Sequence, residues 1–516
     1  MKVETQVVVI GGGLTGAGIL RDLSLRGIDA VLLERRDFNA GASGANHGLL
    51  HSGGRYVVND AESAEECVKE NAILKRVASG CIEDCGGLFI ALNEDSDEYV
   101  TDFLHSAEKV GLNTEQLDVE EALEDEPYVN PDIKAAIRVP DASINPFLAT
   151  NSNLTAAKQD GARVFLHTQV IAMKREGGKI VEVEAINRTT GEKITVVADQ
   201  VVSAAGPWVD QIGALAGVDV KIAYSKGSLL ITNARLVNNV INRLRPPSNG
   251  DIVVPGETVT ITGTTSIRVS NLDYLTTPAA EVDLLVNEAE KLVPAMRDNR
   301  YIRVYAGVRP LVLSDDTDGD RGISRTFTIF DHAKDGIDNF STIAGGKLTT
   351  YRLMAEKISD LVVAKMGLSK KCKTDTVCLP GSEDGQTLDT ALRLSKLKAS
   401  TEESEVICEC EFVGKKQLQE LITELQKDGS KIDPNTLRLR SRLGMGSCQG
   451  GFCGYRTIGF LYEEGVVKQK EGNKMLMEFL ERRWHGTKPV LWGDQLRQEQ
   501  LLEAIYCGSL NIDGNL

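Results

Sequence analysis

A glycine triplet near the N-terminus constrains the fold of this chain more than any other feature. Gly11, Gly13 and Gly16 have the spacing Gly-x-Gly-x-x-Gly and directly follow an apolar run at residues 6–10. A pattern typical of a helix comes next, and a second apolar run occupies residues 30–33. This order of strand, glycine turn, helix and strand is typical of a βαβ unit in a parallel sheet. We therefore expect an α/β fold.

The same unit predicts a dinucleotide-binding site. The glycines let the backbone approach a pyrophosphate at a helix N-terminus, and Glu34, after the second strand, can bind ribose hydroxyls. A tight turn without a function is the alternative, but it would not require an acid at the end of the next strand. Thr15, Arg35 and Ser43 lie in or near this unit, and we expect them to contact the cofactor.

Two later glycine turns favour FAD over NAD as the cofactor. Ala205 and Gly206 follow an apolar run at residues 200–203, and Gly346 precedes a helix predicted over about residues 350–366. A flavin needs such a late helix because the positive end of its dipole stabilises the electron-rich reduced ring. Ordinary strand-to-helix turns are the alternative interpretation. The other residues expected at the cofactor are His47, Gly48, Leu49, Val170, Lys347, Leu348 and Thr349.

The segment at residues 43–56 is predicted to hold an anion beside the redox ring. It carries His47, His51, Arg55 and Tyr56 on a glycine-rich stretch, which suits anion binding next to a cofactor. We expect Arg55 and Tyr56 to bind the substrate, and His51 to orient it or to accept its proton. The alternative for His47 is a hydrogen bond to neighbouring backbone.

Three further cations lie next to glycine or proline, where sharp turns are expected. These are Arg309, Arg325 and Lys347. Forked arginines bind a phosphate dianion well, and all three residues are predicted to bind substrate or to polarise a forming carbonyl. Surface ion pairs are the alternative.

The charge balance excludes some functions. The 516 residues include 58 Lys and Arg against 74 Asp and Glu, a formal net charge of −16. Such an excess of acid argues against a nucleic-acid partner and against a polybasic membrane anchor. An anionic substrate would need a local cluster of cations. The sequence shows no secretory or membrane-spanning pattern, so we expect a cytoplasmic protein that reaches a membrane only through a partner.

Four of the ten cysteines form two close pairs. Cys408 and Cys410 make one pair, and Cys448 and Cys453 make the other. Four thiolates can hold zinc or a [2Fe-2S] cluster. The cluster is favoured because the chain already carries a predicted redox cofactor, while zinc and buried reduced thiols remain alternatives.

Several longer strings resemble the catalytic chains of anaerobic glycerol-3-phosphate dehydrogenases, which are the A components of those complexes. The resemblance covers nearly the whole chain and is carried by residues 46–52, 60–67, 70–71, 226–230, 263–265, 306–311, 345–355 and 444–450. Residues 60–79 are expected to form a helix with Asp60 as its N-cap. The cysteine module resembles the ferredoxin-like domain of a bacterioferritin-associated protein (BFD-like), although its last two cysteines lie further apart here.

The resemblance implies a FAD-binding Rossmann-like domain interleaved with an antiparallel-sheet substrate domain, as in D-amino-acid oxidases. A small helical BFD-like module follows. The expected FAD-binding parts are about 1–79, 151–225 and 305–366, and the substrate parts are 80–150 and 226–304. After the flavoprotein body, 1–366, come a connector at 367–405, the [2Fe-2S] module at 406–460 and an extension at 461–516.

The implied activity is FAD-dependent oxidation of sn-glycerol 3-phosphate to dihydroxyacetone phosphate. Such relatives work with a second flavoprotein component, B, and an iron-sulfur membrane anchor, C, which pass electrons to quinone. That arrangement would place the chain on the inner face of the cell membrane. Two alternatives are oxidation of another 2-hydroxy acid, such as 2-hydroxyglutarate, and a non-catalytic iron-sulfur and flavin module.

Overall fold

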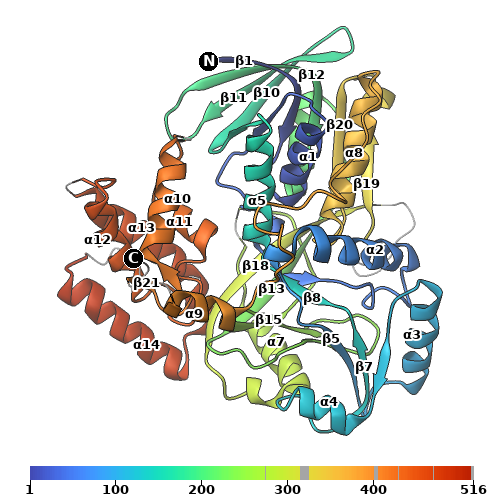
Figure 1. Ribbon diagram of the computed structural model, residues 1–516, viewed down its shortest axis with the longest axis vertical. Coiled ribbons are helices and arrows are strands. Elements are labelled where there is room, and N and C mark those ends of the chain that lie inside the picture. The colour runs from blue at the N-terminus through green and yellow to red at the C-terminus, as the bar shows by residue number, and fades with distance from the viewer. Residues whose placement is uncertain (274, 314–324, 400–404, 428, 469, 513–516) are drawn as a thin grey trace.

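The computed structural model describes residues 1–273, 275–313, 325–399, 405–427, 429–468 and 470–512. Residues 400–404 of the predicted connector and 513–516 of the predicted extension lie outside this part of the chain. The chain folds into a mixed α/β body with a helical module beside it (Figure 1).

The first sheet is built around the predicted βαβ unit. Its parallel strands lie in the order β9-β2-β1-β12-β20, with the β10–β11 hairpin paired to β12 and β19 paired to β20. Val7, Val8 and Val9 are fully buried because both faces of the sheet are covered. The predicted strands at 6–10, 30–33 and 200–203 are confirmed. The strands are β1 (Lys2–Ile10), β2 (Ala30–Leu33), β9 (Arg163–Phe165), β10 (Thr168–Glu176), β11 (Lys179–Asn187), β12 (Lys193–Ser203), β19 (Phe327–Asp331) and β20 (Phe340–Gly345).

Helices cover both faces of this sheet. Three helices share a core with the face of β1 that carries Val7 and Val9, and one short helix packs on the other face. The helix predicted over 350–366 is confirmed as α8. The first three are α1 (Leu14–Leu25), α5 (Pro146–Gln159) and α8 (Tyr351–Lys365), and the short one is α6 (Val209–Ala216).

The second sheet is formed by two segments of chain that are far apart in sequence. Its order is β17-β13-β16-β15-β14-β5-β7-β6, with β18 also paired to β13. The expected antiparallel pairing holds except between β14 and β5, which are parallel, because the two segments meet at that pair. The strands are β5 (Gly87–Leu92), β6 (Glu115–Leu117), β7 (Ile133–Val139), β13 (Ile222–Thr232), β14 (Val240–Arg243), β15 (Ile252–Gly256), β16 (Val259–Gly263), β17 (Ile267–Val269) and β18 (Tyr301–Val312).

A small sheet and a capped helix connect the two large sheets. Asp60 caps helix α2, since its side chain accepts a hydrogen bond from the Ser63 N–H. Glu70 of α2 forms a buried two-point ion pair with Arg352 of α8, at 2.8 and 2.6 Å. The remaining elements of the body are α2 (Ala61–Val77), α3 (Asp97–Lys109), α4 (Val119–Asp125), α7 (Ala279–Leu292), β3 (Leu49–Leu50), β4 (Ile82–Glu83) and β8 (Ala142–Ile144).

The module after the body is mostly helical, as expected. Its core includes the buried side chains of Leu418, Leu461, Phe479 and Tyr506. Helix α12 runs through residue 460, the predicted end of the [2Fe-2S] module, so helices on both sides of that position pack together. Part of the predicted connector packs on the body, where Leu379 is fully buried. The elements are α9 (Thr390–Ala399), β21 (Val406–Cys408), β22 (Val413–Gly414), α10 (Lys415–Lys427), α11 (Pro434–Ser441), α12 (Cys453–Glu463), α13 (Glu471–Thr487) and α14 (Gly493–Glu503).

A group of charges with two buried carboxylates joins this module to the body. Arg442 Nε lies 2.8 Å from Glu411 of the module and 3.0 Å from Glu257 in the turn between β15 and β16. Arg393 pairs with Glu257 and donates to the Glu411 carbonyl at 2.8 Å. Thr258 also donates to Glu411. We call Glu257, Arg393, Glu411 and Arg442 the docking ion cluster.

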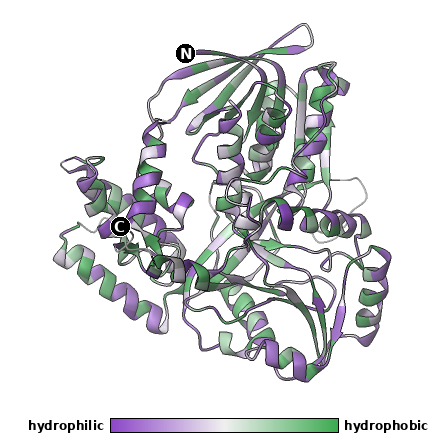
Figure 2. Cartoon of the chain, viewed as in Figure 1, coloured by the Kyte–Doolittle hydropathy of each residue, from purple (hydrophilic) through white to green (hydrophobic). Residues whose placement is uncertain are grey.

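Hydropathy follows this architecture. Figure 2 shows hydrophobic residues along the strands of both sheets and mixed hydrophobic and hydrophilic stretches along outer helices such as α3. Among the described residues, no helix has both the length and the apolar composition needed to cross a bilayer.

Candidate functional site: a cavity that touches both sheets

One cavity of about 1000 Å³ reaches from the glycine triplet to the β13–β18 pair of the second sheet. Most of the predicted site residues line it, although they come from distant parts of the sequence. Those at the triplet end are Gly11, Gly13, Thr15, Glu34, Arg35, Ser43, Val170, Ala205 and Gly206. The other predicted residues in the lining are His47, Leu49, His51, Arg55, Tyr56, Arg309, Arg325, Gly346, Lys347 and Leu348.

Three residues predicted at the cofactor are not part of this lining. A Cβ on Gly16 would lie 1.9 Å from the Gly11 carbonyl oxygen, so Gly16 permits the tight turn rather than the ligand contact. Gly48 adopts φ +72° beside Ile144. Thr349 is buried, and its Oγ1 accepts a hydrogen bond from the His51 N–H at 2.9 Å. These residues shape the cavity from behind.

The triplet end of the cavity fits the pyrophosphate half of FAD. The turn brings Gly11 and Gly13 to the N-terminus of α1, and Ser43 Oγ accepts a hydrogen bond from the Leu14 N–H at 3.0 Å. Glu34 follows β2 and accepts from the Gly12 N–H at 2.7 Å, while burial raises the pKa of its carboxyl. Arg35 stacks on Trp208, with its guanidinium carbon 4.0 Å from the ring centroid.

Arg309 lies where β18 pairs with β13. Its guanidinium donates to the Thr265 carbonyl at 3.2 Å and to the Thr264 hydroxyl. A Cβ on Gly227 of β13 would lie 2.5 Å from Arg309 Nη2, so only a glycine there lets the guanidinium lie across the strand. The absence of one side chain thus fixes the position of the arginine.

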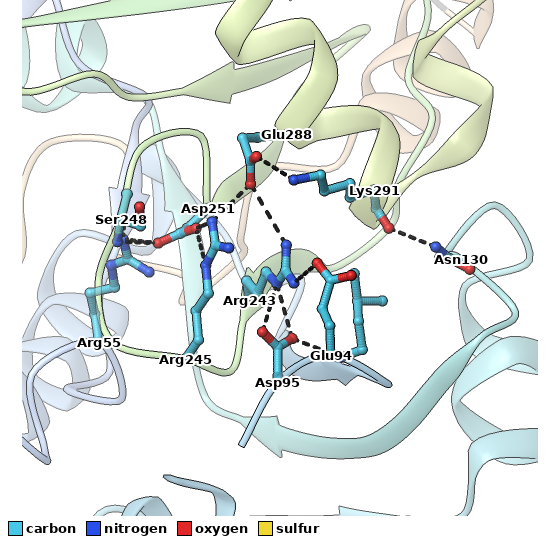
Figure 3. A network of polar contacts seen from close by, with 11 residues as sticks. Arg55, Glu94, Asp95, Asn130, Arg243, Arg245, Ser248, Asp251, Glu288 and Lys291 are labelled. Carbon is cyan, nitrogen blue, oxygen red and sulfur yellow. Dashed lines mark hydrogen bonds and ion pairs between the residues drawn. The ribbon is translucent and has the colours of Figure 1, made fainter. Parts of the chain in front are cut away.

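Arg55 is held by a chain of charges that the sequence did not reveal. Its Nη2 contacts the fully buried carboxylate of Asp251 at 3.0 Å, and Arg245 contacts the same carboxylate at 2.6 Å. Figure 3 shows this chain continuing through Glu288 of α7 to Arg243. Arg55 Nη1 is buried and has no hydrogen-bond partner among the described residues. This orphan donor on a residue of the cavity wall suits a bound anion.

Lys347 and Arg325 are anchored from α2. Lys347 Nζ lies 3.1 Å from Glu66, donates to the Arg325 carbonyl at 3.0 Å and lies 5.3 Å from the Tyr56 ring centroid. The Arg325 N–H donates to Asp60 at 3.0 Å. Lys347 therefore enters the site with its charge already opposed by a carboxylate, which makes it a weaker anion ligand than its sequence context suggested.

The two histidines are neutral at physiological pH. Burial, together with the charges of Arg309 and Arg55, lowers the pKa of His47 to about 3. Burial also holds the pKa of His51 well below its ordinary value, with contributions from His47, Arg55 and Lys347. His47 Nδ1 accepts from the Leu49 N–H at 3.1 Å, which agrees with the backbone-bonding alternative. His51 has no ring hydrogen bond among the described residues, so its ring can accept a proton.

The four predicted ligand cysteines lie together in the module. Cys410 Sγ is 3.9 Å from Cys408 Sγ and 3.7 Å from Cys448 Sγ. The Cys453 thiol is within hydrogen-bonding reach of Cys408 and Cys448. Within the described chain, however, no three Cys, His, Asp or Glu side chains are arranged as ligands of a metal ion. The donor chemistry fits a cluster, and the cluster itself remains a proposal.

Sequence reasoning gave no role in the site to the residues that position the predicted ones. Asp251, Glu66, Asp60 and Gly227 stand far along the chain from their partners. Asp60, Glu66, Gly227 and Thr264 lie in strings that resemble the family, which is a weak signal, whereas Asp251 lies in none of them.

The comparisons with known proteins agree with this geometry. The FAD dependent oxidoreductase family (DAO) matches residues 6–352, so the chain belongs to that class of flavoproteins. The structure of a glycerol-3-phosphate dehydrogenase from Bacillus halodurans complexed with FAD superposes with a TM-score of 0.67 at 20% identity. That superposition covers 95% of this chain and 96% of the other.

Relatives that match nearly the whole chain define its family within this class of flavoproteins. The A component of the anaerobic glycerol-3-phosphate dehydrogenase of Haemophilus influenzae is 42% identical over 99% of this chain and 94% of its own length. Its counterpart from Escherichia coli K12 is also 42% identical, over 99% of this chain and 97% of its own length. Within the flavoprotein class, the chain therefore belongs to the family of anaerobic glycerol-3-phosphate dehydrogenases, as a member of the A-component type.

Proposed function

We propose that the chain oxidises sn-glycerol 3-phosphate to dihydroxyacetone phosphate with FAD. The observation that carries this proposal is the clustering of Arg55, Arg309, Arg325 and Lys347 around the same cavity as neutral His51. In a chain of net charge −16, such a local cation cluster suits a small phosphate ester.

The reaction removes two electrons and two protons from the substrate. Bound FAD supplies the hydride acceptor for the hydrogen on C2, and the C2 hydroxyl loses its proton as the carbonyl forms. His51 accepts this proton, because it is neutral in the free site. Phosphate binding favours the step, since the dianion offsets the positive charges of Arg55 and Lys347 that lower the pKa of His51.

The arginines bind and orient the substrate. Arg55 directs its unpaired Nη1 to the phosphate, and Arg309, fixed across β18 and β13, binds the phosphate or polarises the forming carbonyl. Arg325 and Lys347 close the site from the α2 side and share the same two roles. Tyr56 lies against the His51 ring, with centroids 5.2 Å apart, and fills the wall of the site.

One anaerobic experiment tests the activity. Glycerol 3-phosphate should bleach the flavin absorbance of the purified chain, whereas 2-hydroxyglutarate should leave it unchanged. Bleaching by 2-hydroxyglutarate alone would favour the other 2-hydroxy-acid activity, and no bleaching by either compound would favour a non-catalytic module. Arg309→Ala should abolish bleaching while FAD stays bound, because Arg309 is not at the triplet end of the cavity.

We also propose that Cys408, Cys410, Cys448 and Cys453 hold a [2Fe-2S] cluster, as the ring of thiols and the family resemblance support. Metal analysis separates iron from zinc. Cys448→Ala should spare dye-linked oxidation of substrate but impair transfer to the physiological acceptor.

The relatives are named as one lettered component of a larger enzyme, which supports an assembly. We propose B and C partner subunits, a peripheral position on the inner face of the cell membrane, and quinone as the distant acceptor. We further propose the domain limits predicted from the sequence, with the BFD-like module at 406–460. Co-purification of tagged chain with membranes that contain or lack the partners tests the assembly.

A further inference from the structure

Three arginines, one buried and two partly buried, meet where the module packs on the body. Arg303 comes from β18 of the body, Arg438 from α11 and Arg483 from α13. Arg303 donates to the carbonyls of Arg483 and Arg482 at 3.2 and 3.4 Å. Because a Cβ on Gly486 would lie 2.5 Å from the Arg303 guanidinium carbon, α13 packs directly on this charge.

None of these three arginines forms an ion pair with a carboxylate of the described residues, although cations inside proteins are normally paired. Arg483 is 7% exposed, and its described hydrogen bonds go to the side chain and the carbonyl of Gln449, both neutral. Arg438 Nε is buried without a partner in the described structure. Asp37 and Asp433, the acids whose charges act on Arg438, are already paired with Arg440 and Lys431.

The three charges disfavour one another. Burial, with Arg303 and Arg482 nearby, lowers the pKa of Arg438 to about 9, and burial lowers the pKa of Arg303 to about 10. Burying a charge without a counter-charge costs several kcal/mol on the order of magnitude found in proteins. A fold that keeps three such charges together must therefore place negative charge beside them.

The four-cysteine ring is where that negative charge would lie. Gln449, which binds Arg483, is adjacent to Cys448 in sequence, and both Cys448 and Cys453 are close enough to Arg483 to interact with its charge. Four thiolates around two iron ions carry net negative charge, and that charge grows by one when the cluster accepts an electron.

We propose that the positive charge of Arg483, together with the charges of Arg303 and Arg438 behind it, raises the reduction potential of the iron-sulfur cluster. This inference rests on the proposed cluster in the four-cysteine ring. Fixed positive charge stabilises the reduced, more negative state of the cluster, so it favours electron transfer from the flavin to the cluster. Arg303 lies on β18, the strand that also carries Arg309 at the cavity.

The test is a redox titration of the anaerobically purified full chain, followed by electron paramagnetic resonance of the reduced cluster. Arg483→Gln should lower the ratio of reduced to oxidised cluster at least tenfold at a fixed potential, which is 59 mV for one electron. Arg483→Lys keeps the charge and should retain most of the potential. The exposed neighbour provides the matched control, since Arg482→Gln removes the same formal charge and should shift the ratio much less.

The outcomes separate the two proposals. If the unaltered chain shows no cluster signal, the proposed cluster fails and this inference fails with it. A cluster signal whose midpoint is unchanged in Arg483→Gln overturns the inference alone, as does an equal shift in Arg482→Gln. If Arg483→Gln does not assemble the cluster, the same titration is made with Arg303→Gln, which removes a charge at the body side without touching the cysteine loops. A lowered midpoint in that variant supports the inference, and an unchanged midpoint overturns it.

Discussion

At the scale of single residues, Gly227 shows how an absent side chain positions a reactive one. Gly227→Ala would place a Cβ 2.5 Å from Arg309 Nη2 and push the guanidinium away from Thr264. We expect kcat/KM for glycerol 3-phosphate to fall at least about tenfold, or about 1.4 kcal/mol, with the FAD content unchanged.

The control for this substitution is Gly459→Ala. A Cβ at Gly459 would meet nothing within 4 Å, and the residue lies in α12, away from the cavity. Steady-state kinetics and the flavin spectrum of both variants make the comparison. Equal kcat/KM values for the two would refute the role of Gly227.

The lowered pKa of His47 predicts that the free energy of unfolding depends on pH. Its pKa is about 3 in the folded chain, against an ordinary value of 6.5, so the unfolded chain binds more protons between these values. The stability contributed by neutral His47 is therefore fully present above pH 6.5 and is lost as the pH falls. The loss is up to about 1.4 kcal/mol per pH unit, or about 2 kcal/mol by pH 5.

His47→Gln should flatten this dependence. The unfolding midpoint of the variant should fall less between pH 7 and pH 5 than that of the unaltered chain, measured by scanning calorimetry of the FAD-loaded protein. His485→Gln is the control, because the His485 side chain is 74% exposed. Parallel midpoint curves for His47→Gln and the unaltered chain would contradict the assignment.

At the scale of elements, the N-terminus of α2 stabilises the helix and also anchors the substrate site. Asp60 caps α2 and accepts the Arg325 N–H. Asp60→Ala should cost about 1–2 kcal/mol of stability, the usual range for a lost N-cap, and should also raise KM for glycerol 3-phosphate.

Ser96→Ala separates these two effects. Ser96 caps α3 in the same way, through the Tyr99 N–H, but it is not among the residues that line the cavity. Its loss should lower the unfolding midpoint and leave KM unchanged. An equal KM for Asp60→Ala and the unaltered chain would show that Arg325 does not depend on this cap.

The elements also show what sequence can and cannot predict. The triplet at Gly11, the cap at Asp60 and the helix at 350–366 were predictable because each depends on residues that are neighbours in the chain. The pairing of Lys347 with Glu66 and of Arg55 with Asp251 joins residues 281 and 196 positions apart, so no local pattern indicates it. The parallel pairing of β14 with β5 could not be predicted for the same reason.

At the scale of the whole molecule, the docking ion cluster determines whether module and body unfold together. Glu411 is fully buried, and Glu257 is nearly so. Arg442→Met would leave both carboxylates without their shared cation, and removing one partner of a buried ion pair costs about 3–5 kcal/mol. We expect calorimetry to show a separate, earlier transition for the module.

Arg456→Met is the matched control, because its pair with Glu409 lies at the surface of the same module. Surface pairs contribute about 0–1 kcal/mol, so this variant should keep the unfolding profile of the unaltered chain. A single unshifted transition in Arg442→Met would mean that apolar packing alone holds the module in place.

Strand β18 has a consequence for how this chain can vary in length. Arg303, Tyr305, Gly307 and Arg309 occupy every second position, so they share one face of the strand. They contact in turn the module, the carbonyl of Asn46, the backbone at Ala45 and the substrate end of the cavity. Inserting or deleting one residue between any two of them would turn those on one side of the change to the opposite face from the rest. Length variation among descendants of this sequence must therefore fall in the turns around β18 and never within it.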